Sequence, residues 1–562
     1  MIKNIVIGGE AGQGLKTTAA ILGKALFKNG FNLHTSMDFM SRIRGGHNFG
    51  RIRFGDEEIR GPQEEIDLLV ALNEETITRH VEKLAKDGAV LYDEAVSAVE
   101  NSIVVPAEEI ASEVNPKAVN TVYVGSILKA FGINLDCARS VVEDYFDAES
   151  VISDNLKLLN RGYEKGETIF KAPEPKSRTG EQIYLNGNEA TALGALAGGI
   201  NYYSAYPMSP ATGIMSYIAG KQDEMNVVVE QAEDELAAIN MAIGASYGGI
   251  RTMSGTSGGG LALMNEAIGL AGLTETPLVV ANVQRPGPAT GLPTRTSQGD
   301  LLFAVNSAQG EFPLLITASR NQENAFYQTF RALNLADKYQ LPVILMSDQF
   351  LADSSTNVPD FELQNLEIER NLIAAEDMGP DEEYRRYEFT EDGISPRAFP
   401  GQLKKQTVLA DSDEHDEKGH IVEAADKRRR MVDKRARKLD RLIEDDLAEP
   451  EYFGPENIDY LLVGWGSTYG PLREAQSRLN EEDIKAGYLS FTDVWPLPTT
   501  GLEKLADNEV ELIDVENNSQ AQFARLIRQE TGIEVEHRIL KYDGRPFRGE
   551  EIFRRITEEV IQ

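Results

Sequence analysis

The amino-acid sequence predicts a multidomain α/β protein, and three observations lead to that fold class. Short apolar runs typical of buried strands alternate along the chain with segments whose apolar residues recur at helical spacing. The chain has 562 residues, enough for about three or four domains with a core each. Its composition, 41% hydrophobic and 26% charged residues, is that of an ordinary globular protein.

Composition and charge also exclude several classes of function. Cys137 is the single cysteine, so the sequence provides neither an internal disulfide nor a thiolate set for an iron–sulfur cluster or a structural zinc. A formal net charge of −34 argues against nucleic acid as a partner, since contacts with phosphates dominate such binding. No apolar run has the length of a membrane span and no signal segment precedes the first strand, which predicts a cytoplasmic protein without a membrane partner.

The N-terminal part alternates predicted strands with predicted helices. The strand-like pieces are IKNIVIGG, EIDLLVALN and AVLYDE, and the helix-like pieces are AAILGKALFKNG and TITRHVEKLAKDG. This alternation predicts a layered α/β domain with a largely parallel sheet. The polar, proline-containing segment at 171–182 predicts a linker to the next part of the chain.

The sequence GGEAGQGLKTT, residues 8–18, lies between the first strand and the first helix, where a glycine turn presents backbone N–H groups to an anion. A nucleotide-binding phosphate loop needs lysine directly after its last glycine. Here Leu15 displaces Lys16 by one place, which is about 100° of rotation on a helix. The spacing favours a tight strand-to-helix turn. A non-catalytic nucleotide-binding regulatory protein built on this loop is the alternative of another class.

A second α/β block, up to residue 355, contains a group of acids after the valine-rich strand 226–230. A helix of small residues and the turn TSGGG at 256–260 follow this group. The acids are Glu230, Glu233, Asp234 and Glu235. Because acids favour the first turn of a helix, helix capping is our interpretation of the first three.

Two loops of the same block combine rigidity with polar side chains. The loop SAYPMSPATG, at 204–213, has two prolines and three hydroxyls, those of Tyr206, Ser209 and Thr212. A second loop, within 281–301, is rich in glycine and proline and contains Arg285 and Arg295. Arginines held at a strand end are suited to a bidentate contact with a carboxylate; surface ion pairs are the alternative.

From residue 356 to about 455 the chain changes to long charged stretches. The basic run KRRRMVDKRARK, at 427–438, is followed directly by acids, so a solvated or subunit-contacting helix is favoured over a nucleic-acid patch. His415 and His420 have no metal-site spacing, which predicts a polar surface segment. A last α/β unit begins at YLLVGWGS, residues 460–467.

These motifs together resemble those of the 2-oxoacid:ferredoxin oxidoreductases. YPMSP is similar to the family's Tyr-Pro-Ile-Thr-Pro signature, and EQAEDELAAINMAIGASYGG, TSGGG and GPATGLPTRTSQGDL are similar to its α subunit. GGEAGQG and SRIRGGHNFGRIRF resemble its γ subunit, here fused ahead of α. EHDEKGHI and DVENNSQAQFARLI extend the resemblance over nearly the whole chain.

The resemblance implies four parts. They are a γ-type α/β domain at 1–178, a pyrimidine-binding domain of thiamine diphosphate enzymes at 179–355, a charged connector at 356–455 and a transketolase C-terminal-like domain at 456–562. The implied activity is oxidative decarboxylation of a 2-oxoacid with coenzyme A, giving an acyl-CoA, CO2 and reduced ferredoxin. We expect 2-oxoglutarate as the substrate, with a pyruvate- or arylpyruvate-specific enzyme as the alternative.

The resemblance also assigns roles to residues. Glu235 would activate the cofactor by sharing a proton with a ring nitrogen of its aminopyrimidine, and Ser209 takes the place of the family's threonine against the substrate. Arg295, with Arg285 as runner-up, would bind the substrate carboxylate. Arg44 would meet a phosphate of coenzyme A or be a surface arginine. The remaining candidates are Tyr206 for substrate and, for the cofactor, Thr256, Ser257 and Gly258.

Two absences from the sequence complete the prediction. Thiamine enzymes hold the diphosphate through Mg²⁺ with a Gly-Asp-Gly segment and an Asn-Asn pair, whereas here the pair Asn517–Asn518 stands without a Gly-Asp-Gly. The cysteines that a cluster needs are missing too. We therefore expect Mg²⁺ and the iron–sulfur cluster on a β subunit, an αβ or (αβ)2 assembly, and a chain that is inactive alone.

Overall fold

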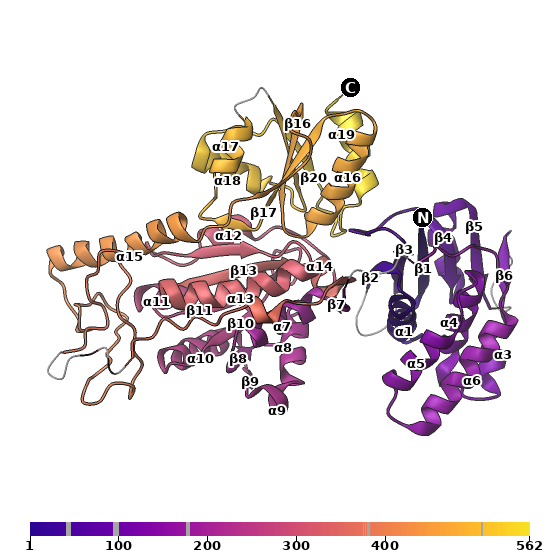
Figure 1. Ribbon diagram of the computed structural model, residues 1–562, viewed down its shortest axis with the longest axis horizontal. Helices are drawn as coiled ribbons and strands as arrows, with labels where there is room; N and C mark the ends of the chain where they lie inside the picture. Colours follow the sequence, from indigo (N-terminus) through magenta and orange to yellow (C-terminus); the bar gives the residue numbers. More distant parts are fainter. Residues whose placement is uncertain are drawn as a thin grey trace. The chain divides into compact units, whose positions relative to one another are not determined.

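The computed structural model describes residues 1–40, 46–93, 101–175, 180–374, 376, 378, 383–506 and 510–561 (Figure 1). Contacts within the chain define two compact units. Unit 1 consists of Met1–Asn186, Asp353–Asp360 and Phe547–Glu551, and unit 2 of Gly187–Ala352, Phe361–Pro546 and Ile552–Gln562. Each unit is an α/β structure, which confirms the predicted fold class; the finer domain bounds given above stay predictions.

Unit 1 has an eight-stranded sheet in its described residues, with strand order β6-β5-β4-β1-β3-β2-β14-β7. The strands are β1 (Ile2–Glu10), β2 (Asn32–Asp38), β3 (His47–Gly55), β4 (Ile66–Ala71), β5 (Leu84–Tyr92), β6 (Ser102–Val104), β7 (Gln182–Asn186) and β14 (Ser355–Pro359). The helices are α1 (Leu15–Lys28), α2 (Glu74–His80), α3 (Ala107–Ser112), α4 (Val119–Ala130), α5 (Asp136–Tyr145) and α6 (Glu149–Lys165).

The prediction of a largely parallel sheet is wrong for half of this sheet. Strands β6, β5, β4 and β1 pair in parallel, whereas β3, β2, β14 and β7 extend the sheet by antiparallel pairs. Only residues 39–46 lie between β2 and β3, too few for the crossover that a parallel pair requires. The predicted helix TITRHVEKLAKDG is also shorter than expected, because β5 begins at Leu84 and pairs there with β4.

The glycine-rich loop is a tight turn, as predicted, between the end of β1 at Glu10 and the start of α1 at Leu15. Gly12 and Gly14 have φ values of 100° and 76°, a region that favours glycine. The ammonium group of Lys16 lies over the ring of Phe39, 4.9 Å from its centroid. The lysine is therefore engaged by an aromatic ring rather than held at the turn.

Unit 2 contains two sheets. The seven-stranded sheet has the order β18-β12-β13-β11-β10-β8-β9 and is parallel except for β18. Its strands are β8 (Tyr202–Ala205), β9 (Val228–Gln231), β10 (Thr252–Thr256), β11 (Leu278–Gln284), β12 (Leu315–Ala318), β13 (Pro342–Asp348) and β18 (Asp493–Trp495). The five-stranded sheet, called the C-terminal sheet below, has β15 (Glu451–Phe453), β17 (Ala486–Phe491), β16 (Tyr460–Trp465), β19 (Glu511–Glu516) and β20 (His537–Leu540).

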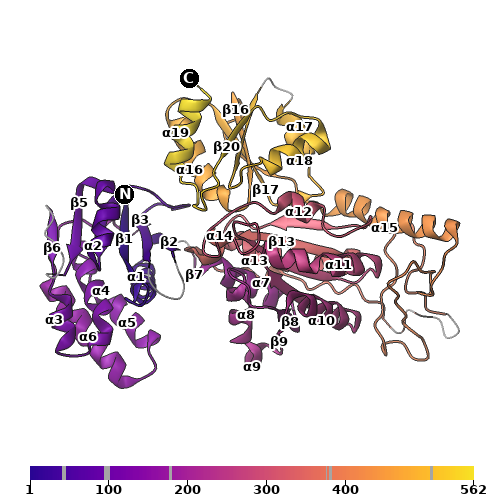
Figure 2. The ribbon, with the colours of Figure 1, turned by 180° about the vertical axis from the view of Figure 1, so that it is seen from behind.

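Helices cover both sheets of unit 2 (Figures 1 and 2). They are α7 (Gly187–Ala197), α8 (Thr212–Ala219), α9 (Gln222–Met225), α10 (Glu235–Tyr247), α11 (Gly258–Leu273), α12 (Leu301–Val305), α13 (Gln322–Tyr339), α14 (Gln349–Asp353), α15 (Ala425–Asp445), α16 (Tyr469–Glu481), α17 (Thr500–Ala506), α18 (Gln522–Thr531) and α19 (Gly549–Glu559). One apolar core joins the two sheets, since Val280 and Ile344 belong to the same cluster as Val463 and Phe523.

The charged region at 356–455 contributes to the core of unit 2, which corrects two predictions. Along α15, Met431, Lys434, Arg435, Lys438 and Leu442 are buried, a spacing that places them on one helical face. The basic run is therefore not simply a solvated helix. The sequence did not reveal this buried face because two of its positions are lysines, and both lysines pair with the buried acid Glu275.

The prediction that His415 and His420 lie in a polar surface segment is correct for only one of the two histidines. His415 is fully buried, with its ring 3.9 Å from that of Tyr387, while His420 is 65% exposed. No group of three or more His, Cys, Asp or Glu side chains in the described residues is arranged to hold a metal ion. Among the same residues, no helix is both long and apolar enough to cross a membrane.

Candidate active site

The predicted motifs of unit 2 follow neighbouring parallel strands. The YPMSP loop follows β8, Asp234 and Glu235 follow β9, the TSGGG turn begins at the last residue of β10 and Arg285 follows β11. Because the carboxyl ends of parallel strands meet at one edge of a sheet, the four motifs lie at the same edge. This is the edge at which open α/β sheets bind ligands.

Glu235 is a buried acid at this edge, with only 3% of its surface exposed. It is the first residue of α10, and Asp234 before it caps the helix by accepting a hydrogen bond of 2.7 Å from the Ala237 N–H. Burial raises the pKa of the Glu235 carboxyl, with a smaller increase from Asp234, while Arg285 opposes the shift. Its Oε1 is buried and has no hydrogen-bond partner in the described part of the chain.

The capping interpretation of the other acids is confirmed for one of them. Asp234 is the cap, whereas Glu230 lies in β9 and so cannot act in the first turn of α10. Glu233 precedes the cap and is exposed. Glu233 is therefore an exposed control for the buried Glu235, which lies two residues later.

The TSGGG turn packs directly on Glu235. A Cβ atom at Gly260 would be 2.6 Å from Glu235 Oε1 and 2.0 Å from Thr256 Oγ1, so only glycine permits this approach. Ser257 is buried, and its Oγ has no partner among the described residues. The turn and the acid thus present two unsatisfied polar atoms, and such atoms are costly unless a bound molecule satisfies them.

The YPMSP loop is joined to the end of β11. Arg285 Nη1 donates a hydrogen bond of 2.6 Å to the carbonyl oxygen of Ser209, and Met208 Sδ lies 3.8 Å from Thr256 Oγ1. Ser209 is half-buried, and Tyr206 is 39% exposed. The structure therefore brings Ser209, Thr256 and Arg285 together with Glu235.

Sequence reasoning missed two polar residues of this edge, Asp300 and Asn282. Asn282 Nδ2 donates to Asp300 Oδ2 at 3.1 Å, and a Cβ atom at Gly258 would be 2.5 Å from the same oxygen. Burial raises the pKa of the Asp300 carboxyl, against the hydrogen bond from Asn282 and the charge of Arg285. An asparagine within the apolar run PLVVANV is the signal that would have indicated this pair.

Arg295 lies farther along the same loop, which we call the Gly/Pro loop (residues 285–300). Its side chain is half-buried, and a Cβ atom at Gly544 would be 3.0 Å from Arg295 Cβ. The next residue, Thr296, donates its backbone N–H to the Gly544 carbonyl at 3.3 Å. Arg44, the remaining predicted contact, lies outside the described residues.

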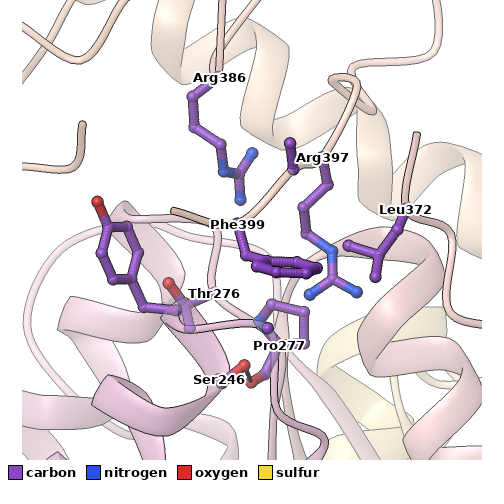
Figure 3. Close-up of a pocket in the computed structure, with 10 residues that line it drawn as sticks. Ser246, Thr276, Pro277, Leu372, Arg386, Arg397 and Phe399 are labelled. Atoms are coloured by element: carbon purple, nitrogen blue, oxygen red, sulfur yellow. Dashed lines mark hydrogen bonds between the residues drawn. The ribbon is translucent and has the colours of Figure 1, made fainter. Parts of the chain in front are cut away.

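A separate pocket of unit 2 contains none of the predicted site residues (Figure 3). It is lined by residues that include Tyr247, Phe399, Arg386 and Arg397. Both arginines already have partners in the chain: Arg386 donates to the Glu275 carbonyl at 2.6 Å, and Arg397 donates to Asp337 Oδ1 at 2.5 Å. Of the buried polar atoms of these two arginines, only Arg397 Nε lacks a partner in the described residues, so the pocket offers less unsatisfied polarity than the edge around Glu235.

Comparison with known proteins defines the class first. Residues 193–434 match the family model described as pyruvate flavodoxin/ferredoxin oxidoreductase, thiamine diphosphate-binding. Residues 4–165 match pyruvate ferredoxin/flavodoxin oxidoreductase, and residues 458–552 match core domain II of pyruvate:ferredoxin oxidoreductase. The chain is thus an oxidoreductase subunit with a thiamine diphosphate-binding domain.

More specifically, the chain belongs to the 2-oxoacid:ferredoxin oxidoreductase family, as the resemblance indicated. A 2-oxoacid:ferredoxin oxidoreductase subunit alpha from Sulfolobus sp. is 34% identical over 97% of this chain and 95% of its own length. The 2-oxoglutarate oxidoreductase subunit KorA of Mycobacterium tuberculosis is 28% identical over 98% of this chain and 91% of its own. A solved structure is that of the 2-oxoglutarate:ferredoxin oxidoreductase of Magnetococcus marinus with 2-oxoglutarate, coenzyme A and succinyl-CoA bound. It aligns with this chain over 100% of both chains, with 31% identity and a TM-score of 0.92.

The C-terminal sheet brings a buried pair of acids close to the Gly/Pro loop. Asp514 and Glu516 are fully buried on β19, and burial raises the pKa of both carboxyl groups. Glu516 raises the pKa of Asp514 further, against the opposing charge of Arg538. Neither oxygen of Asp514 accepts a hydrogen bond within the described residues, so no donor there offsets the cost of burying its charged form.

This pair predicts a pH-dependent stability. A carboxyl whose pKa is raised by folding stabilises the protein at low pH, and that contribution is lost as the pH rises through the folded-state pKa. Each pKa unit corresponds to about 1.4 kcal/mol. We therefore expect Asp514→Asn, which does not titrate, to raise the unfolding temperature relative to wild type at pH 8, and to raise it less at pH 5.

Thermal unfolding at the two pH values measures the effect. Asp459→Asn is the matched control, because Asp459 is an exposed acid immediately before β16 of the same sheet. It should leave the pH dependence as in wild type. An Asp514→Asn effect of equal size at both pH values would contradict a pKa of Asp514 raised by folding.

Proposed function

We propose that this chain is the α subunit, with a fused γ-type domain, of an enzyme that converts a 2-oxoacid and coenzyme A to an acyl-CoA and CO2. The electron pair released on loss of CO2 passes to ferredoxin, and 2-oxoglutarate is the substrate that we favour. One observation carries the proposal. The buried carboxyl of Glu235, with its raised pKa and unpartnered Oε1, faces a glycine turn at the ligand-binding edge of a parallel sheet.

The residues at this edge fit thiamine diphosphate. Glu235 Oε1 and Ser257 Oγ offer the acid and the hydroxyl that a polar ring requires, and the turn of Thr256, Ser257 and Gly258 provides the surrounding backbone. When bound, the cofactor supplies a carbon nucleophile and an electron sink for decarboxylation. The part of Glu235 is to hold a proton at its carboxyl against a ring nitrogen, and burial favours this by raising the pKa of that carboxyl.

The preference for 2-oxoglutarate rests on relatives. The solved Magnetococcus marinus enzyme has 2-oxoglutarate and succinyl-CoA bound, and the Mycobacterium tuberculosis relative is named for the same acid. The Sulfolobus relative is named for 2-oxoacids in general. Pyruvate and arylpyruvate therefore remain alternatives that the assay must include.

The proposed partner subunit follows from the cofactor-binding residues that this sequence lacks. The chain has no Gly-Asp-Gly segment and a single cysteine, so we propose that a β subunit contributes Mg²⁺, the remaining diphosphate contacts and the iron–sulfur cluster. Ferredoxin would then accept electrons from that subunit, in an αβ or (αβ)2 assembly in the cytoplasm. Arg44 stays a proposed contact for a coenzyme A phosphate.

The test is reduction of a viologen dye by the complex purified with its partner subunit. Pyruvate, 2-oxoglutarate, an arylpyruvate and a branched 2-oxoacid are compared, each with and without coenzyme A. We expect reduction that requires coenzyme A, is fastest with 2-oxoglutarate and is absent from this chain alone. A complex that retains thiamine diphosphate and its cluster but oxidises none of these acids would refute the proposal.

The two arginines are separated by their effects on KM and kcat. If Arg295 binds the substrate carboxylate, Arg295→Gln should raise KM for the 2-oxoacid about tenfold to a hundredfold, since a hydrogen bond to a charged group contributes about 1.5–3 kcal/mol. Arg285→Gln should mainly lower kcat, because Arg285 holds the Ser209 carbonyl and lies close enough to the Glu235 carboxyl to influence its pKa. Steady-state kinetics of both variants decides, and the reverse pattern would assign the carboxylate to Arg285.

A further inference from the structure

The pocket of Figure 3 lies at the end of α10 that is opposite the proposed active site. Glu235 is the first residue of α10, whereas the pocket is lined by Ser246 and Tyr247 at the end of that helix and by Pro277, directly before β11. Its free volume at the scale of a water molecule is about 10 Å³, which is about the space that one water molecule needs. The pocket is therefore a separate site with room for a very small ligand.

Two buried arginines, Arg386 and Arg397, line this pocket, and each is only 5% exposed. Figure 3 shows both side chains extending toward the ring of Phe399. Each guanidinium has five N–H donors, and hydrogen bonds within the described residues engage two of them on each arginine. Arg397 Nε is buried without a partner there, and the described lining residues include no Asp or Glu. The pocket thus offers donors and positive charge without an acidic side chain.

Arg397 shares its acidic partner, Asp337, with two other arginines. Arg397 Nη2 donates to Asp337 Oδ1 at 2.5 Å, while nitrogens of Arg251 and Arg370 lie 2.8 Å and 3.0 Å from Asp337 Oδ2. Asp337 and Arg251 are buried as well, whereas Arg370 is 29% exposed. A single carboxylate therefore faces three guanidinium groups.

Arg386 has only neutral hydrogen-bond acceptors in the described part of the chain. Its Nη1 donates to Gln340 Oε1 at 2.7 Å, and its Nη2 donates to the backbone carbonyl of Glu275 at 2.6 Å. The carboxylate of Glu275 is bonded instead to Lys434 and Lys438, and all three of those side chains are fully buried. Burial lowers the pKa of both lysines, and the charge of Arg386 lowers it further. A second carboxylate therefore faces more positive charge than it can neutralise.

The groups around Asp337 and Glu275 together have an excess of positive charge. Six cationic side chains share the two carboxylates, so the excess is four charges, or three when Lys438, whose pKa burial lowers to about 7, is neutral. The pKa of Arg397 is lowered to about 10 by burial and by the charges of Arg386 and Arg370, although Asp337 opposes the shift. Uncompensated charge in a protein interior is costly, and a bound anion would offset that cost.

We propose that the pocket binds a monoatomic anion, chloride in solution, between Arg386 and Arg397. The small free volume favours a single ion over a phosphate or an organic acid, and charge-assisted hydrogen bonds from the two guanidinium groups hold the ion. The bound ion offsets part of the buried positive charge and so stabilises unit 2. This site is independent of the proposed enzymatic activity, and its test needs no substrate.

The direct test uses bromide, which replaces chloride at such sites and is located by its anomalous X-ray scattering. Crystals of the full chain, purified together with its partner subunit, are soaked in sodium bromide. We expect an anomalous peak between the guanidinium groups of Arg386 and Arg397. A wild-type crystal without a peak in this pocket would overturn the proposal, because water alone would then occupy the space.

A measurement in solution shows that the ion binds outside a crystal. Unfolding by urea is followed while sodium gluconate is exchanged for sodium chloride at constant ionic strength, because gluconate is too large for the pocket. A ligand that binds only the folded state stabilises it by RT ln(1 + [L]/Kd). The unfolding equilibrium constant should therefore fall by up to about tenfold for each tenfold rise in chloride, and bromide should have the same effect.

Arg397→Gln and a matched control locate the effect in this pocket. The control is Arg370→Gln, because Arg370 also donates to Asp337, at 3.0 Å, but does not line the pocket. We expect Arg397→Gln to lose both the chloride dependence and the bromide peak, and Arg370→Gln to keep both. An equal chloride dependence in wild type and Arg397→Gln would contradict the site. If Arg397→Gln does not fold, the bromide peak in wild type decides.

Discussion

Glu235→Gln is expected to lower the rate of 2-oxoacid oxidation by about a hundredfold to ten-thousandfold, the range in which a positioned acid or base contributes. Glutamine has the same shape, but it cannot share a proton with a ring nitrogen. The raised pKa of the Glu235 carboxyl, which burial causes, is the property that the substitution removes. Viologen reduction by the complex, with saturating coenzyme A, measures the loss.

The neighbouring acid provides the control for this prediction. Glu233→Gln makes the same chemical change two residues earlier, at an exposed side chain, and should leave the rate at the wild-type value. Thiamine diphosphate bound to each variant is quantified, so that loss of cofactor is distinguished from loss of activation. A Glu235→Gln complex that keeps the cofactor and the wild-type rate would contradict the assigned role.

Glu275→Ala is expected to destabilise unit 2 by about 3–5 kcal/mol, the cost of removing one partner from a buried ion pair. Lys434 Nζ lies 2.6 Å from Oε1 and 2.8 Å from Oε2 of Glu275, Lys438 also bonds to Oε2, and all three side chains are fully buried. Burial lowers the pKa of Lys438 to about 7 even with Glu275 present. The two lysines hold the pKa of Glu275 below its ordinary value although burial opposes them.

Two comparisons isolate the cause of this destabilisation. Glu417→Ala removes the partner of Lys427 on the same helix, but both of those side chains are about one-fifth exposed, so the loss should be about 1 kcal/mol or less. Replacing Glu275, Lys434 and Lys438 together by methionine removes every charge and should restore most of the stability. Denaturant unfolding measures all three proteins, and a triple variant as unstable as Glu275→Ala would contradict the charge explanation.

The edge of the seven-stranded sheet was predictable because its motifs follow recognisable strands. Apolar runs such as NVVVE and PLVVANV locate β9 and β11, and polar side chains after parallel strands necessarily gather at one edge. Residues of that edge that lack a motif were not predicted. Asp300 and Gln298 are held by bonds to Asn282, Trp465 and Asn517, and contacts over such separations leave no pattern in a single sequence.

Charge misled the interpretation of α15 for a physical reason. Helical periodicity of apolar residues is the signal for a buried face, but two positions on the buried face of α15 are lysines that pair with Glu275, far away along the chain. The antiparallel half of the sheet in unit 1 was missed for a related reason. Alternating strands and helices indicate layers, and only the length of the β2–β3 connection indicates pairing direction.

Strand β18 makes the middle and the end of the chain one folding unit. It pairs with β12 at the edge of the seven-stranded sheet. Arg331 of α13 donates two hydrogen bonds of 2.7 Å to the carboxylate of Asp493 in β18. Without β18, β12 would be an open edge whose unpaired N–H and C=O groups invite other chains and aggregation. The cofactor-binding part therefore depends on β18, which is translated about 175 residues after β12. A nascent chain has to protect the edge of β12 until β18 has been synthesised.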